Sequence, residues 1–211
     1  MYIRPAATAT DDGLRYLQIF DSQLGWLCSI GSSPQWGSSP RSNKEELQVE
    51  YRNKVKSSEQ CWNEPWNRES VRAYIAEIEI KQVELPHRLL ELAIESTNNR
   101  VRVPVAGMVL QGQSSEYVRD IIAENDDNDA FIYLSYITSD RRMAPFGKGA
   151  GARLISHAKD EALRLGFRRL CLDCWRGNDN KLIRYYEKQG FRAIGDFEVN
   201  NWQGTVLEMR L

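Results

Sequence analysis

Cysteine is scarce in this chain. Four cysteines in 211 residues are too few for the dense disulfide framework of a small secreted domain, so we expect a reducing, cytoplasmic environment. Cys171 and Cys174 have the spacing of half a zinc or redox site. They lie in the alternating apolar run LCLDC, in which residues three apart point to opposite faces of a strand. We therefore interpret both as buried structural thiols and expect no metal site.

Long apolar runs and an excess of positive charge are also missing. No stretch approaches the roughly 18–20 apolar residues of a membrane span, and the first ten residues lack an apolar signal core. Lys and Arg number 28 against 29 Asp and Glu, whereas proteins that bind nucleic-acid phosphates usually carry a basic excess. These absences predict a protein that binds neither membranes nor nucleic acids.

The length of 211 residues fits one domain with an elaboration better than two equal domains. An apolar content of 42% supplies a core that needs no disulfide or metal. We expect residues 1–211 to form a single domain, mainly helical over about 1–85 and followed by a core over about 86–211.

Helical spacing dominates the first part. Residues 1–5 have the composition of a short strand, and apolar residues recur at helical spacing over 14–27. The pattern Ser42-Asn-Lys-Glu45 is a capping box, which predicts a second helix through about Lys56. A third helix is expected near 70–83.

Strand patterns dominate the remainder. Branched apolar residues over 89–96 and 101–110 flank turn residues, which predicts a β-hairpin. The near-continuous apolar run 131–137 predicts a central strand that is buried on both faces. Four further elements are expected: a helix ended by Gly166, a strand over 169–174, a helix capped by Asn178 and stopped by Gly190, and a final hairpin of 191–199 with 205–211.

A glycine-rich loop, FGKGAGA, lies between the central strand and the helix that follows it. Unpaired N–H groups and the helix dipole meet at such a helix start and attract anions. Glycines let the backbone approach a pyrophosphate without a Cβ collision, and Lys148 adds charge at the rim. Three glycines can equally form a flexible hinge, so the loop alone does not decide.

Two nucleotide-binding patterns compete for this loop. No Lys-Ser or Lys-Thr stands where a Walker A loop requires one, which argues against nucleotide hydrolysis. Gly147-x-Gly149-x-x-Ala152, with Asp173 beyond it, fits a dinucleotide fingerprint, so a dinucleotide-binding oxidoreductase is an alternative. However, the loop does not follow the strand directly, and too little chain remains for the second half of a doubly wound sheet.

The loop, Asn178 after the next strand and the run YYEKQGF from Tyr185 to Phe191 together resemble the GNAT superfamily of acetyl-CoA-dependent N-acetyltransferases. The family loop is usually written Arg/Gln-x-x-Gly-x-Gly/Ala, and its last two places fall on Gly149 and Gly151. Phe146 occupies the Arg/Gln place. The resemblance is strongest over about 130–191.

The resemblance implies an α/β fold with a mixed, bent sheet of about six or seven strands, flanked by helices and preceded by a helical N-terminal elaboration. Two central strands, 131–138 and 169–174, would splay apart and hold the pantetheine arm of acetyl-CoA. The implied activity is direct transfer of an acetyl group to a primary amine in a ternary complex. The acceptor would be a small molecule or a protein amine, and the protein a monomer or a homodimer. A non-catalytic acyl-CoA-binding module is a further alternative.

The resemblance also implies roles for individual residues. The backbone of Ile137, Thr138 and Ser139 would bind the pantetheine and thioester, and Asn178 would contact the coenzyme near its sulfur. The pyrophosphate would lie on the loop formed by Phe146, Gly147, Lys148, Gly149, Ala150 and Gly151. Tyr186 corresponds to the family tyrosine that protonates the departing thiolate, and a phenol with a pKa near ~10 keeps its proton at neutral pH.

The acceptor site and the general base are less determined. Trp36 and Tyr136 are our candidates for acceptor binding; Trp26, Gln35, Trp62 and Trp66 could also line the pocket, although aromatic packing is the simpler interpretation. We interpret Asp140 and Asp173 as strand-end caps or outward-facing residues, and His87 and His157 as surface or packing residues. The acids Glu124, Asp126, Asp127 and Asp129 are typical of a solvated loop.

Overall fold

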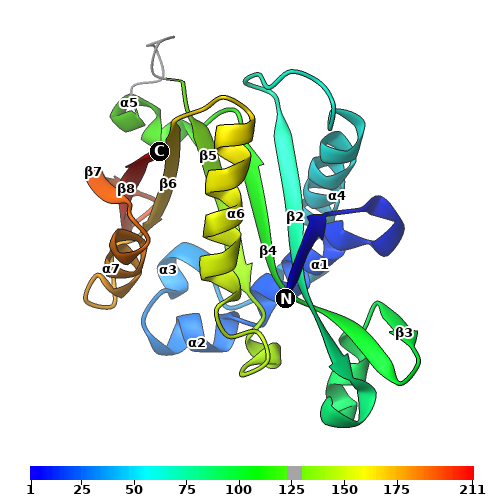
Figure 1. Ribbon diagram of the computed structural model, residues 1–211. Coiled ribbons are helices and arrows are strands. Elements are labelled where there is room, and N and C mark those ends of the chain that lie inside the picture. Colours follow the sequence, from blue (N-terminus) through cyan, green and yellow to red (C-terminus); the bar gives the residue numbers. More distant parts are fainter. Residues whose placement is uncertain (123–129) are drawn as a thin grey trace.

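The computed structural model describes residues 1–122 and 130–211, and its strands form one sheet. The order is β1-β2-β4-β5-β6-β8-β7, with β3 paired on β4 (Figure 1). The strands are β1 Tyr2–Pro5, β2 Val71–Lys81, β3 Glu95–Thr97, β4 Arg100–Gln111, β5 Ile132–Ser139, β6 Arg169–Trp175, β7 Arg192–Val199 and β8 Trp202–Arg210. The predicted fold class is confirmed; the sheet has eight strands because Val71–Lys81 forms the additional strand β2.

Helices cover both faces of this sheet. They are α1 Asp12–Asp21, α2 Leu24–Ser29, α3 Ser33–Trp36, α4 Glu45–Gln60, α5 Arg119–Ile122, α6 Ala150–Arg164 and α7 Lys181–Lys188. One core cluster contains the apolar stripe of α6, among it Leu154 and Ala158, together with Ile183 of α7. A second cluster on the other face joins Tyr16 of α1 and Val55 of α4 to the sheet. None of the described helices has the length and apolar character needed to cross a membrane.

The parallel strands β5 and β6 separate soon after they begin. They pair only at Ile132 with Leu170 and at Tyr133 with Cys171, although β5 continues to Ser139 and β6 to Trp175. The register of β5 against β4 also shifts opposite Val109 and Leu110. The predicted splaying of the two central strands is therefore confirmed.

The helix predicted near 70–83 is wrong, because this segment is the strand β2. Val71, Ala73 and Ile75 pack toward α1 and α4, whereas Tyr74 and Ala76 pack on the side of α6. Residues 71–77 are buried on both faces, so this part of the strand has no solvent-exposed polar face that would reveal its period of two residues. The first 85 residues thus contain two strands of the sheet among the helices α1 to α4, and the helices cover more residues than the strands.

The predicted hairpin is half right. Its turn is present, since Asn98 and Asn99 have left-handed φ values of 50° and 62°. The segment expected as a strand over 89–96 is largely a 3-10 helix, His87–Leu92, and pairing is confined to Glu95–Thr97. Buried leucines at 89 and 92 explain the apolar run, because they pack at the helix spacing.

The predicted caps at the starts of α4 and α7 are wrong, whereas the predicted ends of α6 and α7 are confirmed. The Ser42 capping box is wrong, because α4 begins at Glu45 without a side-chain cap bond, and the amide of Ser42 donates to Asp21. Asn178 is not the cap of α7, which begins at Lys181 after a left-handed Asn180. Gly166 and Gly190 have φ values of 86° and 101°, which confirms both predicted helix stops.

Helix α1 is fixed to the sheet through the phenol of Tyr16. Its hydroxyl lies 2.8 Å from the carbonyl oxygen of Tyr74 and 3.1 Å from that of Met108. The ring lies against Gly107, where an added Cβ would be 2.5 Å from ring carbon Cε1. This close approach therefore requires glycine on β4.

We expect Gly107→Ala to lower the free energy of unfolding by about 1–3 kcal/mol, because the new methyl group would overpack the Tyr16 ring. Chemical denaturation measures this loss. Gly25→Ala in α2 is the control, since no atom lies within 4 Å of its added Cβ and alanine favours helix. Equal stability of the two variants would contradict the packing of α1 on β4.

Candidate functional site

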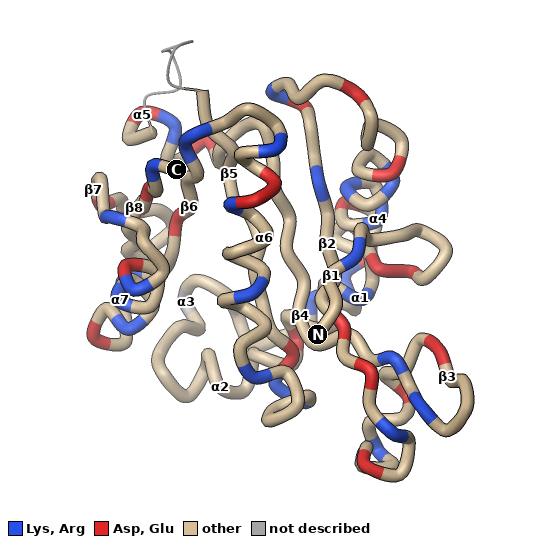
Figure 2. Tube along the Cα trace, in the orientation of Figure 1, with Lys and Arg blue, Asp and Glu red and all other residues tan. Residues whose placement is uncertain are grey.

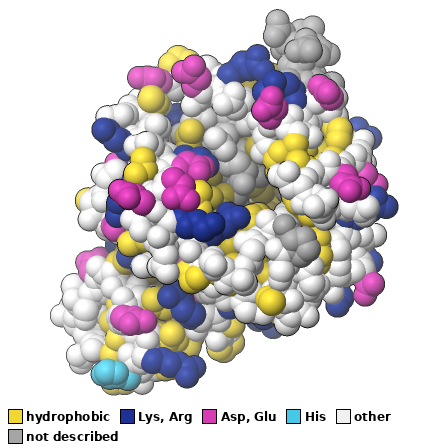
Figure 3. Space-filling model, turned by 180° about the vertical axis from the view of Figure 1, so that it is seen from behind, with side chains coloured by type: hydrophobic (Ala, Val, Ile, Leu, Met, Phe, Trp, Pro, Cys, Tyr) yellow, Lys and Arg dark blue, Asp and Glu magenta, His cyan; other side chains and the backbone are white. Residues whose placement is uncertain are grey.

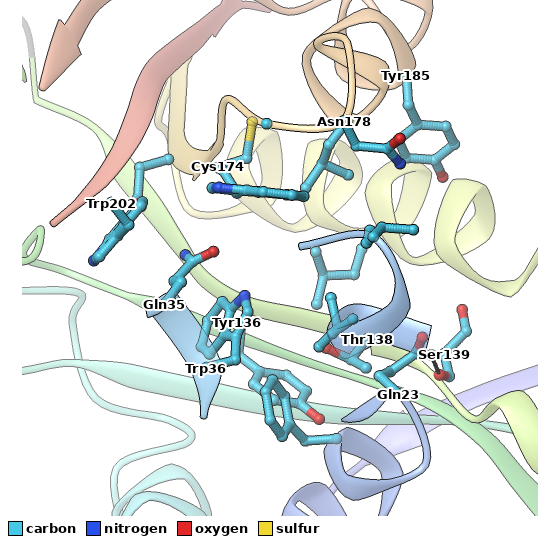
Figure 4. Close-up of a pocket in the computed structure, with 18 of the residues that line it drawn as sticks. Gln23, Gln35, Trp36, Tyr136, Thr138, Ser139, Cys174, Asn178, Tyr185 and Trp202 are labelled. Carbon is cyan, nitrogen blue, oxygen red and sulfur yellow. Dashed lines mark hydrogen bonds between the residues drawn. The ribbon is translucent and has the colours of Figure 1, made fainter. Parts of the chain in front are cut away.

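A cavity of ≈ 620 Å³ lies where β5 and β6 separate. Its wall includes residues of β5, of β6 and of the first turns of α7, and is completed by α1, α2 and α3. Asn178 and Tyr185 lie at one end, whereas Trp202, Gln35 and Trp36 lie at the other (Figure 4). Figure 3 shows the molecule from behind, with a hollow that is bordered by hydrophobic side chains and by charged ones.

The glycine loop adjoins the first end of the cavity. An added Cβ on Gly151 would lie 3.0 Å from the hydroxyl of Tyr185 and 3.9 Å from Oγ of Ser139, and both of these residues line the cavity. Gly149 has a left-handed φ of 86°, which places a tight turn directly before α6. The loop therefore presents the start of α6 to this end of the cavity.

Only part of this loop offers free amides. The amides of Gly147, Lys148 and Ala150 donate to carbonyl groups within the turn, those of Met143, Pro145 and Gly147. Within residues 1–122 and 130–211, the amides of Gly149, Gly151 and Ala152 have no acceptor. Phe146 packs against the main core cluster. An anion would thus meet three amides at the helix start.

The end of β5 forms one side of the cavity. Ile137, Thr138 and Ser139 pair with β4 through their other edge and line the cavity. The carbonyl oxygen of Ser139 accepts a hydrogen bond from Gln23, which links β5 to the segment between α1 and α2 (Figure 4). Gln23 is a site residue that no sequence signal indicated.

Tyr185 and Tyr186 occupy different positions on α7. Tyr186 is 6% exposed and packs on Phe191, and burial raises its pKa well above the ordinary value. Its hydroxyl has no hydrogen bond within the described part of the chain, so its proton is available. Tyr185 is 37% exposed. Both residues line the cavity, and both are protonated at neutral pH.

Aromatic residues line the second end. The Trp36 ring lies 5.0 Å from that of Phe20, and Tyr136 donates its hydroxyl to the carbonyl of Tyr16 at 2.7 Å. Trp26 and Gln35 also line the cavity, as does Trp202, which sequence reasoning missed because it lies in the last hairpin. Trp62 and Trp66 are not in the cavity wall; they pack on Tyr74 and Phe167.

Asp173 was wrongly interpreted as an outward-facing residue. It lies in the cavity wall, accepts a hydrogen bond from Tyr133, and has the hydroxyl of Tyr117 at 3.3 Å. Among the described residues it is the one carboxylate in that wall. Burial raises its pKa, although the two tyrosine hydroxyls oppose this shift. Strand alternation places Asp173 on the side of Cys171, but that pattern does not reveal the cavity.

The other titratable candidates lie elsewhere. Asp140 caps the 3-10 turn Arg141–Met143 and accepts from the amide of Arg142 at 2.9 Å, which confirms the cap interpretation. His157 packs against the ring of Tyr74 with 4.5 Å between the ring centroids, and His87 is exposed. Glu124, Asp126, Asp127 and Asp129 lie outside the described residues.

Cys171 and Cys174 lie on opposite faces of β6, in different core clusters, as predicted. Within the described ranges, no group of three or more His, Cys, Asp or Glu side chains is arranged to hold a metal ion.

A family model, described as "Acetyltransferase (GNAT) family", matches residues 52–191. This chain is a GNAT acetyltransferase. No curated protein gives a significant match to its sequence. The GNAT family and the mixed, largely antiparallel sheet exclude the doubly wound dinucleotide-binding fold considered above.

Solved acetyltransferase structures share the fold at low sequence identity. A GNAT-family acetyltransferase from Listeria monocytogenes has a TM-score of 0.56 at 16% identity, over 100% of this chain and 94% of that one. YncA from Salmonella typhimurium, solved with its cofactor acetyl-CoA, has a TM-score of 0.55 at 14% identity, over 100% and 93%. An N-acetyltransferase from Staphylococcus aureus has a TM-score of 0.55 at 13% identity, over 99% and 97%.

The environment of Asp173 generates a prediction about its ionisation. We expect its pKa to lie above the ordinary value of 3.8, because burial disfavours the charged form. Tyr117→Phe removes a hydroxyl that stabilises the carboxylate, and should raise the pKa further. Carbon-13 NMR titration of the carboxyl group measures both values. A value at or below 3.8, or no change in the variant, would contradict this description.

Proposed function

We propose that this GNAT protein transfers an acetyl group from acetyl-CoA to a primary amine by direct attack in a ternary complex. The observation that carries the proposal is the cavity itself, which continues from the gap between β5 and β6 to an aromatic end with one carboxylate. We take residues 1–211 as one N-acetyltransferase domain, whose first 85 residues contribute α1, α2 and α3 to the acceptor side.

The coenzyme would enter along the separated strands. Its pyrophosphate would meet the amides of Gly149, Gly151 and Ala152, with the positive end of the α6 dipole behind them and Lys148 at the rim. Ile137 and Thr138 would offer the backbone edge that faces away from β4 to the amide groups of the pantetheine. Asn178, at the same end of the cavity as Tyr185, would contact the coenzyme near its sulfur.

Proton transfer would involve two residues of the cavity wall. An ammonium group must lose a proton before it attacks, and Asp173, which lies in the cavity wall, would accept that proton. The neutral amine forms a bond to the thioester carbon, and the tetrahedral intermediate then breaks its carbon–sulfur bond. Tyr186 donates its proton to the leaving thiolate, and regains one as the amide nitrogen loses its surplus proton through the cavity.

Gly149→Val should weaken CoA binding strongly, because a left-handed φ of 86° is strained for valine and the free amide would shift. Gly166→Val is a matched control. Gly166 lies at the other end of α6, has the same φ, and likewise has no atom within 4 Å of an added Cβ. Both variants should lose similar stability, but only Gly149→Val should lose affinity in isothermal titration with CoA. Equal CoA affinities in the two variants would contradict the proposal that the pyrophosphate binds to this loop.

Tyr186→Phe should lower kcat by about 10²–10⁴-fold, because it deletes the proton donor while the ring keeps its packing. The KM for acetyl-CoA and the melting temperature should change little. Tyr185→Phe, the neighbouring change on α7, should reduce kcat far less. Release of free thiol with an accepted amine provides the rate. Turnover near the wild-type rate in Tyr186→Phe would show that another group protonates the sulfur, and CoA binding without transfer to any amine would favour a non-catalytic acyl-CoA-binding module.

A further inference from the structure

Arg41 is a charged residue of the cavity wall that the proposed chemistry leaves unused. Its guanidinium carbon lies 4.4 Å from the centroid of the Phe20 ring and 4.8 Å from that of Trp36. No carboxylate within the described ranges lies at ion-pair distance from this group. The nearby carboxylate of Asp21 is instead occupied by backbone amides, those of Arg41 at 2.6 Å and Ser42 at 3.0 Å. The fold thus fixes the backbone of Arg41 and leaves its charge unpaired beside the cavity.

Arg41 lies at the acceptor end. It stacks on Trp36, which Figure 4 places beside Gln35 and Tyr136, away from Asn178 and Tyr185. Its charge also acts on the phenols of Tyr51 and Tyr136, where it opposes the rise in pKa that burial causes. The two rings lie 5.0 Å apart, so the guanidinium rests over both of them. This stacking restricts the orientation of its planar fork, which favours bidentate binding of a carboxylate.

Gln35 adds an unused hydrogen-bond acceptor at the same end. Its Oε1 atom is buried and has no donor within residues 1–122 and 130–211. Buried polar atoms normally have a partner, so an N–H group of a bound molecule would satisfy it. Gln35 and Arg41 could therefore both be satisfied by one ligand that carries a hydrogen-bond donor and an anionic group.

The distribution of charge in the cavity wall argues against a polycationic acceptor such as a polyamine. Its described charged residues are Arg41, Arg141, Asp173 and Lys181. Lys181 lies 3.3 Å from the side-chain oxygen of Asn178. Arg141 follows the Ser139 end of β5, and its guanidinium stacks over the ring of Trp26 at 4.6 Å. We assign both cations to the coenzyme end. The helices α2 and α3 carry no charged residue (Figure 2). One cation and one carboxylate remain for the acceptor, and a polyamine would place positive charge beside Arg41.

We propose that the acceptor is an amino acid, or a close analogue with a free carboxylate. Arg41 binds the carboxylate, and the amine is received by Oε1 of Gln35 and by Asp173. The aromatic rings of Trp36, Tyr117 and Trp202 leave the side-chain region apolar. This assignment rests on the acetyl transfer proposed above and specifies its substrate class.

The test compares matched acceptors. Each of a panel of apolar and aromatic amino acids is assayed beside its carboxamide and its decarboxylated amine, together with spermidine and a C-terminally amidated peptide. For the wild type we expect kcat/KM to be about 10–100-fold higher for the best amino acid than for its carboxamide, because a charge-assisted bidentate pair is lost. Free thiol release measures each rate.

Arg41→Met keeps an unbranched stem against the two rings and removes the charge. We expect it to lose this preference, with kcat/KM falling for the amino acid and little changed for the carboxamide. Arg41→Lys should retain part of the preference. Arg52→Met is the control, since Arg52 is half exposed on α4 and outside the cavity wall, and it should behave as the wild type. Melting curves and CoA titration verify that each variant is folded.

The outcomes separate the two proposals. If the wild type acetylates carboxamides, decarboxylated amines, spermidine or the peptide as well as amino acids, the carboxylate assignment is overturned and acetyl transfer stands. An amino-acid preference that persists in a folded Arg41→Met also overturns the role of Arg41. If Arg41→Met does not fold, the wild-type comparison and Arg41→Lys decide. Failure to acetylate any amine despite CoA binding would overturn the proposed function itself.

Discussion

The separation of β5 from β6 after two residue pairs is the constraint on which the site depends. Beyond Tyr133 and Cys171, each strand has one backbone edge without a partner strand, and backbone groups in a protein interior need hydrogen bonds. The shift in register opposite Val109 and Leu110 bends β5 away from its neighbour. An extended ligand with amide groups of its own would satisfy these edges as a further strand would. Helix α6 begins beside the same gap. The amides at its start could therefore bind an anion next to the point where the strand edges bind an extended chain.

The helices on the two faces keep this gap open. Helix α6 packs against β4, β5 and β6 from one side, whereas α1 is held on the other by the Tyr16 hydroxyl and by the close contact at Gly107. Gln23, after α1, bonds to the last residue of β5. The segment that follows carries Gln35, Trp36 and Arg41 across the open end. The N-terminal elaboration would therefore form the proposed acceptor side through the packing of α1.

Local signals in the sequence predicted the parts of the fold that local chemistry determines. Gly166 and Gly190 stop helices because they adopt left-handed φ values, and the apolar stripe of α6 follows the helical period. Strand β2 could not be recognised in this way, because most of it is buried on both faces and its pairing with β4 joins residues far apart in the chain. The leucines at 89 and 92 suggested a strand for the same reason, since a short apolar run has no distinct period.

The site residues likewise fall into those that a contiguous sequence motif predicts and those that only the fold brings together. The glycine loop and the YYEKQGF run are contiguous, so their positions could be predicted, although which amides of the loop are free depended on the turn geometry. Asp173, Trp202 and Arg41 come from separate elements, and only the fold brings them to one cavity. Asp173 illustrates the reason: alternation along β6 gives the face on which it lies, but not whether that face meets solvent, core or cavity.

A crystal structure of the protein with bound CoA tests the central claim most directly. We expect the pantetheine to lie between β5 and β6 beyond Tyr133, the pyrophosphate to accept hydrogen bonds from the amides of Gly149, Gly151 and Ala152, and the sulfur to lie near Tyr186. CoA bound outside the gap, or a gap closed by continued pairing of β5 with β6, would contradict it.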